Sequence, residues 1–252
     1  MIKKVLKLLI ITLYSVLQKP TKKLRTAANY RMNNFKGKIN TFWPSIIGEF
    51  QNEDHEKIKE ELMNYFSDYE KENPKGNKQL QDKNYVGNYN LYQSDYDLHS
   101  TQNQTLKTLF GYIGNCIAET VKFANKNQIE KIIDKSKKLN VRFNETWFIR
   151  YNKEGFIFPH SHSNCSWCGL YYVQIGKDAS IKNGSTYFMR PYSGSIDKND
   201  FGSLHLEDEN RLFIPREGKL LVWPSHLQHG SHPYSGEKDR TIISINSSTL
   251  LV

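Results

Sequence analysis

WFIRYNKEGFIFPHSHSNCSWCGLYYVQ, residues 147–174, combines aromatic and β-branched side chains with two histidines spaced two apart, His160 and His162. In an extended strand, side chains i and i+2 point to the same face, whereas on a helix this spacing separates them by about 200°. Gly155, Pro159 and the apolar neighbours favour an extended chain over 156–162. The stretch therefore predicts a strand that presents two imidazoles to one spot.

A second stretch, GKLLVWPSHLQHGSHPYSGEKDRTIISIN, occupies residues 218–246. It begins as an apolar strand over 220–223, breaks at Pro224, and after a turn continues as a last strand from residue 240. Three histidines follow the break: His226, His229 and His232. The last strand places four residues on one face by its period of two: Arg240, Ile242, Ser244 and Asn246. A buried arginine needs an anion, so this face predicts an anion site.

The chain resembles the 2-oxoglutarate/Fe(II)-dependent oxygenase family in the order and spacing of four segments: PHSHSNCSWCGLYYVQ, GSTYFMRP, GKLLVWPSHLQHG and RTIISIN. The closest resemblance is to a group common in marine phage and bacteria, whose members typically contain H-x-H, SGVYYV and R-x-S-x-S-x-N. Two upstream segments, TFWPSIIGEF and YVGNYNLYQS, resemble the leading region of that group. The similarity therefore covers roughly residues 40 to 248.

The resemblance implies an Fe(II)- and 2-oxoglutarate-dependent dioxygenase, a hydroxylase of unknown primary substrate that consumes dioxygen. It assigns the metal to three histidines: His160, His162 and His229. Arg240 would hold the distal carboxylate of 2-oxoglutarate, because a guanidinium and a carboxylate form parallel charge-assisted hydrogen bonds. Three further residues would assist binding of the oxoacid: Tyr172, Ser244 and Asn246.

Two positions depart from the usual pattern and leave alternatives open. His162 stands where most such oxygenases carry a carboxylate ligand. Either His162 binds the metal directly, or it lies behind the ligands without binding the metal and an acidic residue elsewhere in the chain is the third ligand. Ile242 stands where the group more often has serine. These departures keep a second hypothesis, a catalytically inactive metal-binding jelly roll that serves as a binding or structural module. Arg240 also has a structural alternative, an ion pair with Asp239 or Glu237.

Cys165 and Cys168 form a C-x-x-C motif beside His160 and His162. Two imidazole nitrogens and two thiolate sulfurs are a ligand set of structural zinc sites, so a zinc site is an alternative hypothesis here. Nine residues leave little chain to wrap a tetrahedron, and the following GLYYVQI favours a strand over a thioredoxin-like junction. Only Cys116 remains, so no disulfide framework is indicated. We expect reduced cysteines beside the site and a reducing compartment, most simply the cytoplasm.

The net charge of +9 is concentrated in a basic leader, residues 1–39. The leader contains ten Lys or Arg and no acid, leaving 25 of the 35 basic residues against 26 acidic ones in 40–252. This nearly neutral body gives no indication of nucleic-acid binding. Residues 1–18 hold only eleven uncharged residues between Lys7 and Lys19, too few to span a bilayer. They suit contact with a membrane surface, a targeting segment, or an amphipathic helix docked on the body.

The body, residues 40–252, is predicted as one domain. Periodicity indicates a short strand and turn over 41–52, helices over 52–72, with Asp54 as cap, and 105–125, and a second basic helix over 128–138. Strands follow, over 141–151, 156–162, 168–175, 185–190, 211–214, 219–223 and 240–248. This order predicts an α+β fold, a double-stranded β-helix (jelly roll) with flanking N-terminal helices. The polar insertion over 192–210 predicts a loop near the mouth of the barrel.

Overall fold

In the part of the chain that the structure describes, the sheet has nine strands in the order β1-β7-β4-β9-β3-β8-β5-β6, with β2 paired to β3. The structure is a computed structural model that describes residues 45–78, 87–126, 128, 139–191 and 210–251. Its strands are β1 (Gly48–Gln51), β2 (Asn88–Gln93), β3 (Leu139–His160), β4 (Trp167–Gln174), β5 (Thr186–Met189), β6 (Asn210–Phe213), β7 (Lys219–Pro224), β8 (His229–Tyr234) and β9 (Arg240–Leu251). Its helices are α3 (His55–Glu72), α4 (Gln104–Ala124) and the short 3-10 helix η2 (Leu98–Ser100).

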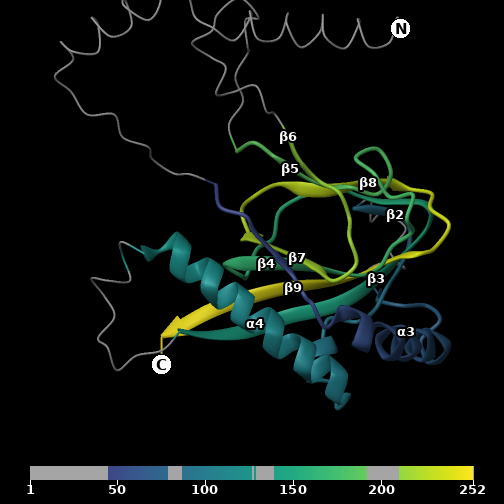
Figure 1. Cartoon of the computed structure of the whole chain (residues 1–252), viewed down its shortest axis with the longest axis horizontal. Coiled ribbons are helices and arrows are strands. Elements are labelled where there is room, and N and C mark those ends of the chain that lie inside the picture. Colours follow the sequence, from purple (N-terminus) through teal and green to yellow (C-terminus); the bar gives the residue numbers. More distant parts are fainter. Residues whose placement is uncertain (1–44, 79–86, 127, 129–138, 192–209, 252) are drawn as a thin grey trace, which may run out of the picture. The chain divides into compact units, whose positions relative to one another are not determined.

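Strand β3 joins the two layers of the sheet. Its first part pairs with β9 from Leu139 to Tyr151, and its last part pairs with β8 from Gly155 to His160. One layer is therefore β1-β7-β4-β9-β3, and β8, β5 and β6 continue the sheet from the far end of β3. Figure 1 shows β5, β6 and β8 lying above β4, β7 and β9, with α3 and α4 outside the lower layer. This is the jelly roll with flanking helices that the sequence predicts.

Alternate residues of the lower layer face two different cores. Toward the helices lie Phe148, Tyr171, Val173, Leu220, Val222, Ile243 and Ile245. Toward the interior of the roll lie Trp147, Ile149, Tyr151, Cys168, Leu170, Tyr172, Leu221, Trp223 and Ile242. Since the side-chain period of a strand is two, one register fixes both cores. The interior face is the one that carries the candidate site.

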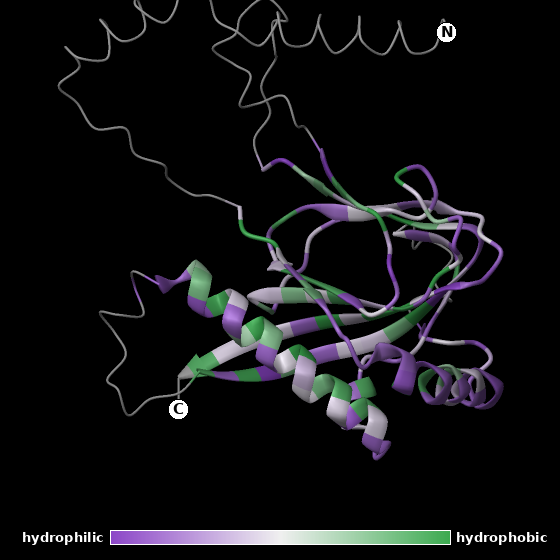
Figure 2. Ribbon diagram, viewed as in Figure 1, coloured by the Kyte–Doolittle hydropathy of each residue, from purple (hydrophilic) through white to green (hydrophobic). Residues whose placement is uncertain are grey.

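The two predicted long helices are present. In α4 the apolar residues at helical spacing are buried, and Asn103 caps the helix by accepting a hydrogen bond from the Leu106 N–H at 2.9 Å. In α3 the buried residues are His55, Leu62 and Phe66. Asp54 stands at the N-cap position, but its side chain caps no backbone N–H and instead pairs with Lys57. Figure 2 shows α3 as mostly hydrophilic and α4 as a mixture of apolar and polar residues.

Four details of the strand prediction are wrong. Two predicted strands are one, because β3 runs without interruption through Gly155. It ends at His160, so His162 lies beyond the strand, where its N–H donates to the Ser225 carbonyl at 3.0 Å. His232 lies within β8 and Asn88–Gln93 forms β2, and neither of these strands was predicted. Pairing with β3 determines both of these strands, although Pro233 and Asn90 are poor strand residues.

Several predictions concern residues outside those described. They are the basic leader, the helix over 128–138, of which only residue 128 is described, and the insertion over 192–210, which is described only at 210. Among the described residues, no helix is long and apolar enough to cross a membrane.

Phe148 is the packing centre between β3 and the helices, and we predict that Phe148→Ala lowers the free energy of unfolding by about 3–5 kcal/mol. Its ring is fully buried, stacks on Phe66 at 4.3 Å between centroids, and also contacts Tyr69 and Tyr92. Phe158→Ala on the same strand is the control, since that ring is 46% exposed and its loss should change stability by less than about 0.5 kcal/mol. Equal effects in urea denaturation would contradict this packing.

Candidate functional site

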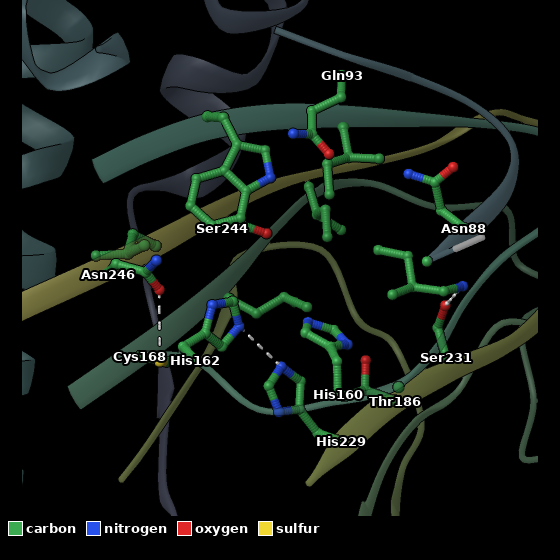
Figure 3. Close-up of a pocket in the computed structure, with 18 of the residues that line it drawn as sticks. Asn88, Gln93, His160, His162, Cys168, Thr186, His229, Ser231, Ser244 and Asn246 are labelled. Atoms are coloured by element: carbon green, nitrogen blue, oxygen red, sulfur yellow. Dashed lines mark hydrogen bonds between the residues drawn. The ribbon is translucent and has the colours of Figure 1, made fainter. Parts of the chain in front are cut away.

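The interior face of the roll lines a cavity of about 510 Å³. Its wall includes the three histidines proposed as ligands and the arginine proposed as anion site: His160, His162, His229 and Arg240. Figure 3 shows the three imidazoles turned toward one another, with Thr186 nearby and Ser244 and Asn246 along the opposite wall. The structure thus brings together residues that are up to 80 positions apart.

The histidine cluster forms where two strands meet. His160 is the last residue of β3 and pairs with His229, the first residue of β8. His162 joins them from the following turn, which places its Nε2 3.3 Å from the Nε2 of His229. One ring nitrogen from each of the three lies within 4.8 Å of the others. Two cis nitrogen ligands of one metal stand about 3 Å apart when metal–nitrogen bonds are near 2.1 Å, so the cluster fits a metal ion.

Hydrogen bonds fix the tautomers of two of these histidines. The Nδ1 of His160 lies 2.9 Å from the Phe158 carbonyl, and the Nδ1 of His229 lies 2.9 Å from the Leu227 carbonyl. A carbonyl only accepts, so each Nδ1 carries the proton and each Nε2 keeps a lone pair. Burial lowers the pKa of His160, and burial and the neighbouring His160 lower the pKa values of His162 to about 4 and His229 to about 3. The cluster is therefore neutral near pH 7, as ligand imidazoles must be.

The metal-binding group contains no carboxylate. Among the described residues, the only other group of this kind is His55, Glu56 and Glu217. The Glu217 carboxylate already accepts hydrogen bonds from the Lys59 ammonium at 2.6 Å and from the Ile175 N–H at 3.0 Å. Both of its oxygens therefore have donors within the protein. The three-histidine cluster is consequently the stronger candidate metal centre.

Arg240 is fully buried and incompletely paired. Its guanidinium lies 4.1 Å from the centroid of the Tyr151 ring, and its Nη2 donates to the Thr186 hydroxyl at 3.1 Å. Nε and Nη1 have no hydrogen-bond partner. No described ion pair includes Arg240, so the structural alternative with Asp239 or Glu237 is not observed. The unpaired donors belong to a residue that lines the cavity, as a carboxylate-binding arginine requires.

The remaining predicted residues occupy distinct places. Tyr172 is buried beside Arg240, with its hydroxyl 2.6 Å from that of Thr186. Ser244 lines the cavity further along β9. Asn246 lies beyond it, where its amide donates to Glu145 at 2.9 Å and its oxygen accepts from the Cys168 thiol at 3.5 Å. Asn246 lies six residues along β9 from Arg240, opposite Glu145 and not opposite Tyr151.

The cysteines do not form a zinc site with the histidines. Their sulfurs lie 3.7 Å apart, and both cysteines are free thiols. Neither belongs to a group of three metal-ligating side chains within the described residues. Cys168 is instead part of the cavity wall.

Sequence reasoning missed four residues of the site: Tyr151, Thr186, Glu145 and Trp147. Tyr151 covers Arg240, and Thr186 binds it. The period of two along β3 places Trp147, Ile149 and Tyr151 on one face, and that signal was available. The same period extends to Glu145, whereas Thr186 carried no such signal, because pairing with the distant strand β8 places it.

Comparisons with known proteins give one family match, over part of the chain. Residues 145–246 match the model of a family described as "Putative 2OG-Fe(II) oxygenase". This stretch contains the three clustered histidines, Arg240 and Asn246. No curated protein sequence matches the chain.

Three solved structures are similar to this chain, each with a TM-score below 0.5. An oxidoreductase of the 2OG-Fe(II) oxygenase family from Burkholderia pseudomallei has a TM-score of 0.38 and 10% identity, covering 63% of this chain and 66% of that chain, just under two thirds. HygX from Streptomyces hygroscopicus, with nickel and 2-oxoglutarate bound, has a TM-score of 0.47 and 13% identity over 81% and 82% of the two chains. A prolyl-4-hydroxylase from Pseudomonas putida has a TM-score of 0.49 and 10% identity over 81% and 92%. Similarities this low identify no substrate for this chain.

The family match covers most of β3, all of β4 to β8 and the first part of β9, which carry the three clustered histidines and the buried arginine. It agrees with the resemblance inferred from the sequence: residues 145–246 are similar to the family of 2OG-Fe(II) oxygenases.

Proposed function

We propose that His160, His162 and His229 hold Fe(II) and that Arg240 holds the distal carboxylate of 2-oxoglutarate in a dioxygenase that hydroxylates its primary substrate. The observation that carries this assignment is one cavity that contains three neutral imidazoles and a buried guanidinium with two unpaired nitrogens. The metal would couple oxidative decarboxylation of the oxoacid by dioxygen, which yields succinate and carbon dioxide, to hydroxylation of a C–H bond.

The residues of the chain would orient the oxoacid and exclude water around it. Arg240 supplies charged donors at the closed end of the cavity, and Thr186 and Tyr172 form a hydroxyl pair beside it. Ile149 and Ile242 face each other across β3 and β9 and form an apolar wall next to that end. In such a wall of low polarity, a charge-assisted pair is stronger than in water.

His162 is proposed as the third ligand because its Nε2 faces the His229 Nε2 at 3.3 Å. The alternative, an acid from elsewhere, finds no support in the cluster, which contains only imidazoles among the described residues. For residues 1–18 we propose contact with a membrane surface, and for the protein a reducing, most simply cytoplasmic, compartment. The free thiols support the latter proposal.

We predict that His229→Ala abolishes both iron binding and oxoacid turnover. Loss of one of three ligands leaves two imidazoles, which is insufficient for a stable site. After anaerobic addition of Fe(II) and 2-oxoglutarate, the visible metal-to-ligand charge-transfer band and, after admission of oxygen, succinate should appear in the wild type and be absent from this variant.

The matched control is His226→Ala, because His226 is exposed and lies only three residues away, outside the cluster. It should retain the band and turnover of the wild type. A band of normal intensity in His229→Ala would refute the ligand assignment.

Arg240→Lys should weaken the binding of 2-oxoglutarate roughly ten- to hundredfold and leave iron binding intact. Lysine keeps the charge but not the planar fork of donors, and loss of one charged hydrogen bond costs about 1.5–3 kcal/mol. The dissociation constant is obtained by titrating the charge-transfer band with the oxoacid.

Arg216→Lys, at an exposed position, is the control for this change. It should leave the oxoacid affinity unchanged. Equal affinities in wild type and Arg240→Lys would show that another group binds the distal carboxylate.

A further inference from the structure

The interior face of β3 and β9 extends well beyond the place proposed for the oxoacid. Four cross-strand pairs follow one another along it: Tyr151 with Arg240, Ile149 with Ile242, Trp147 with Ser244, and Glu145 with Asn246. Six residues of strand span about 20 Å, whereas a five-carbon diacid is roughly 7 Å long. An oxoacid anchored at Arg240 therefore leaves the Glu145 end of the face vacant for the primary substrate.

Glu145 is the acid of this cavity. Of the described residues that line it, Arg240 and Glu145 are the only basic and acidic side chains apart from the histidines proposed as metal ligands. Arg240 is committed to the oxoacid under the proposed function. A substrate that reaches the other end meets one carboxylate, the amide of Asn246 and the indole of Trp147.

Glu145 continues the period of two of Trp147, Ile149 and Tyr151, so its side chain lies on this face. The pairing of β3 with β9 shifts between Phe143 and Glu145, and Asn144 holds the irregular segment by donating to the Asn164 carbonyl at 2.6 Å and the Ser248 hydroxyl at 2.9 Å. The regular register of this face therefore ends at Glu145. The residue is exposed at the rim, so a ligand can reach it.

Asn246 orients the carboxylate. It is only 4% exposed, its oxygen accepts from the Cys168 thiol, and this leaves its amide to donate to Oε2 of Glu145. Figure 3 shows the bond between Cys168 and Asn246. Within the described part of the chain, Oε1 of Glu145 has no hydrogen-bond donor, so a fixed carboxylate retains one free oxygen.

We infer that Glu145 determines substrate specificity by binding a cationic amino or guanidino group on the primary substrate. This inference rests on the proposed function, since it places the substrate beside a metal held by the histidine cluster. A free carboxylate oxygen at a partly shielded rim forms a charge-assisted hydrogen bond to an ammonium group, and the face of Trp147 suits the adjoining alkyl chain. A neutral or anionic group in the same place would leave the carboxylate without a counterion.

The test uses protein loaded anaerobically with Fe(II) and 2-oxoglutarate and a matched pair of probes. Nα-acetyl-L-lysine methylamide carries the ammonium group, and Nα-acetyl-L-norleucine methylamide is its neutral counterpart. Calorimetric titration should give about five- to tenfold tighter binding of the cation. Spermidine forms a second arm, which distinguishes a free amine from a lysine side chain as the source of the group.

Glu145→Gln keeps the hydrogen bond from Asn246 and removes only the charge, so the preference for the cationic probes should disappear. Glu154→Gln, an exposed position on the same strand, should keep the preference. If the wild type binds cationic probes no better than the neutral one, or if Glu145→Gln retains the preference, the inference is wrong. The charge-transfer band reports the proposed function separately: its absence from the wild type would refute that function, whatever the probes do.

Discussion

The burial of Arg240 is the constraint on which the rest of this structure depends. Removing a guanidinium from water costs several kcal/mol, and here one neutral hydrogen bond and the Tyr151 ring offset only part of that cost. The fold therefore keeps a buried guanidinium whose two unpaired nitrogens an anion in the cavity would bind. This requirement fixes the register of β9 against β3, because a slip of one residue would turn Arg240 toward the helix-side core.

Strand β3 connects that constraint to the metal centre. The same strand covers Arg240 with Tyr151 and ends nine residues later at His160, which faces His229 across the pair with β8. The distance between the anion site and the histidines is thus set by one continuous strand and not by a loop. Gly230 allows the approach of β8, because a Cβ there would meet the Tyr187 hydroxyl at 2.6 Å and the Ile157 carbonyl at 2.8 Å.

Sequence reasoning succeeded where local periodicity carries the information. The face of β9 follows from the period of two, and the helices follow from buried residues at helical spacing. The convergence of His160 with His229 came from the family resemblance, because no local pattern links residues 69 positions apart. Strand β8 was missed since HGSHPY has a polar, proline-containing composition and becomes a strand through its partners. Glu145 was missed although it continues the period of two of Trp147, Ile149 and Tyr151, because its hydrogen bond to Asn246 joins two strands that no local pattern links.

The neutral ligand set changes the electrostatics of the whole cavity. With a carboxylate among the ligands, part of the charge of Fe(II) would be cancelled before the oxoacid arrives. With the three imidazoles proposed as ligands, none of it would be cancelled, so a dianionic oxoacid would meet the full charge of the metal at one end and the guanidinium of Arg240 at the other. Together these three charged groups sum to plus one, and Glu145 at the rim brings the cavity to neutrality. A histidine in the place of the usual acid is therefore compatible with the anionic co-substrate, and it moves the negative charge of the cavity from the metal to the substrate end.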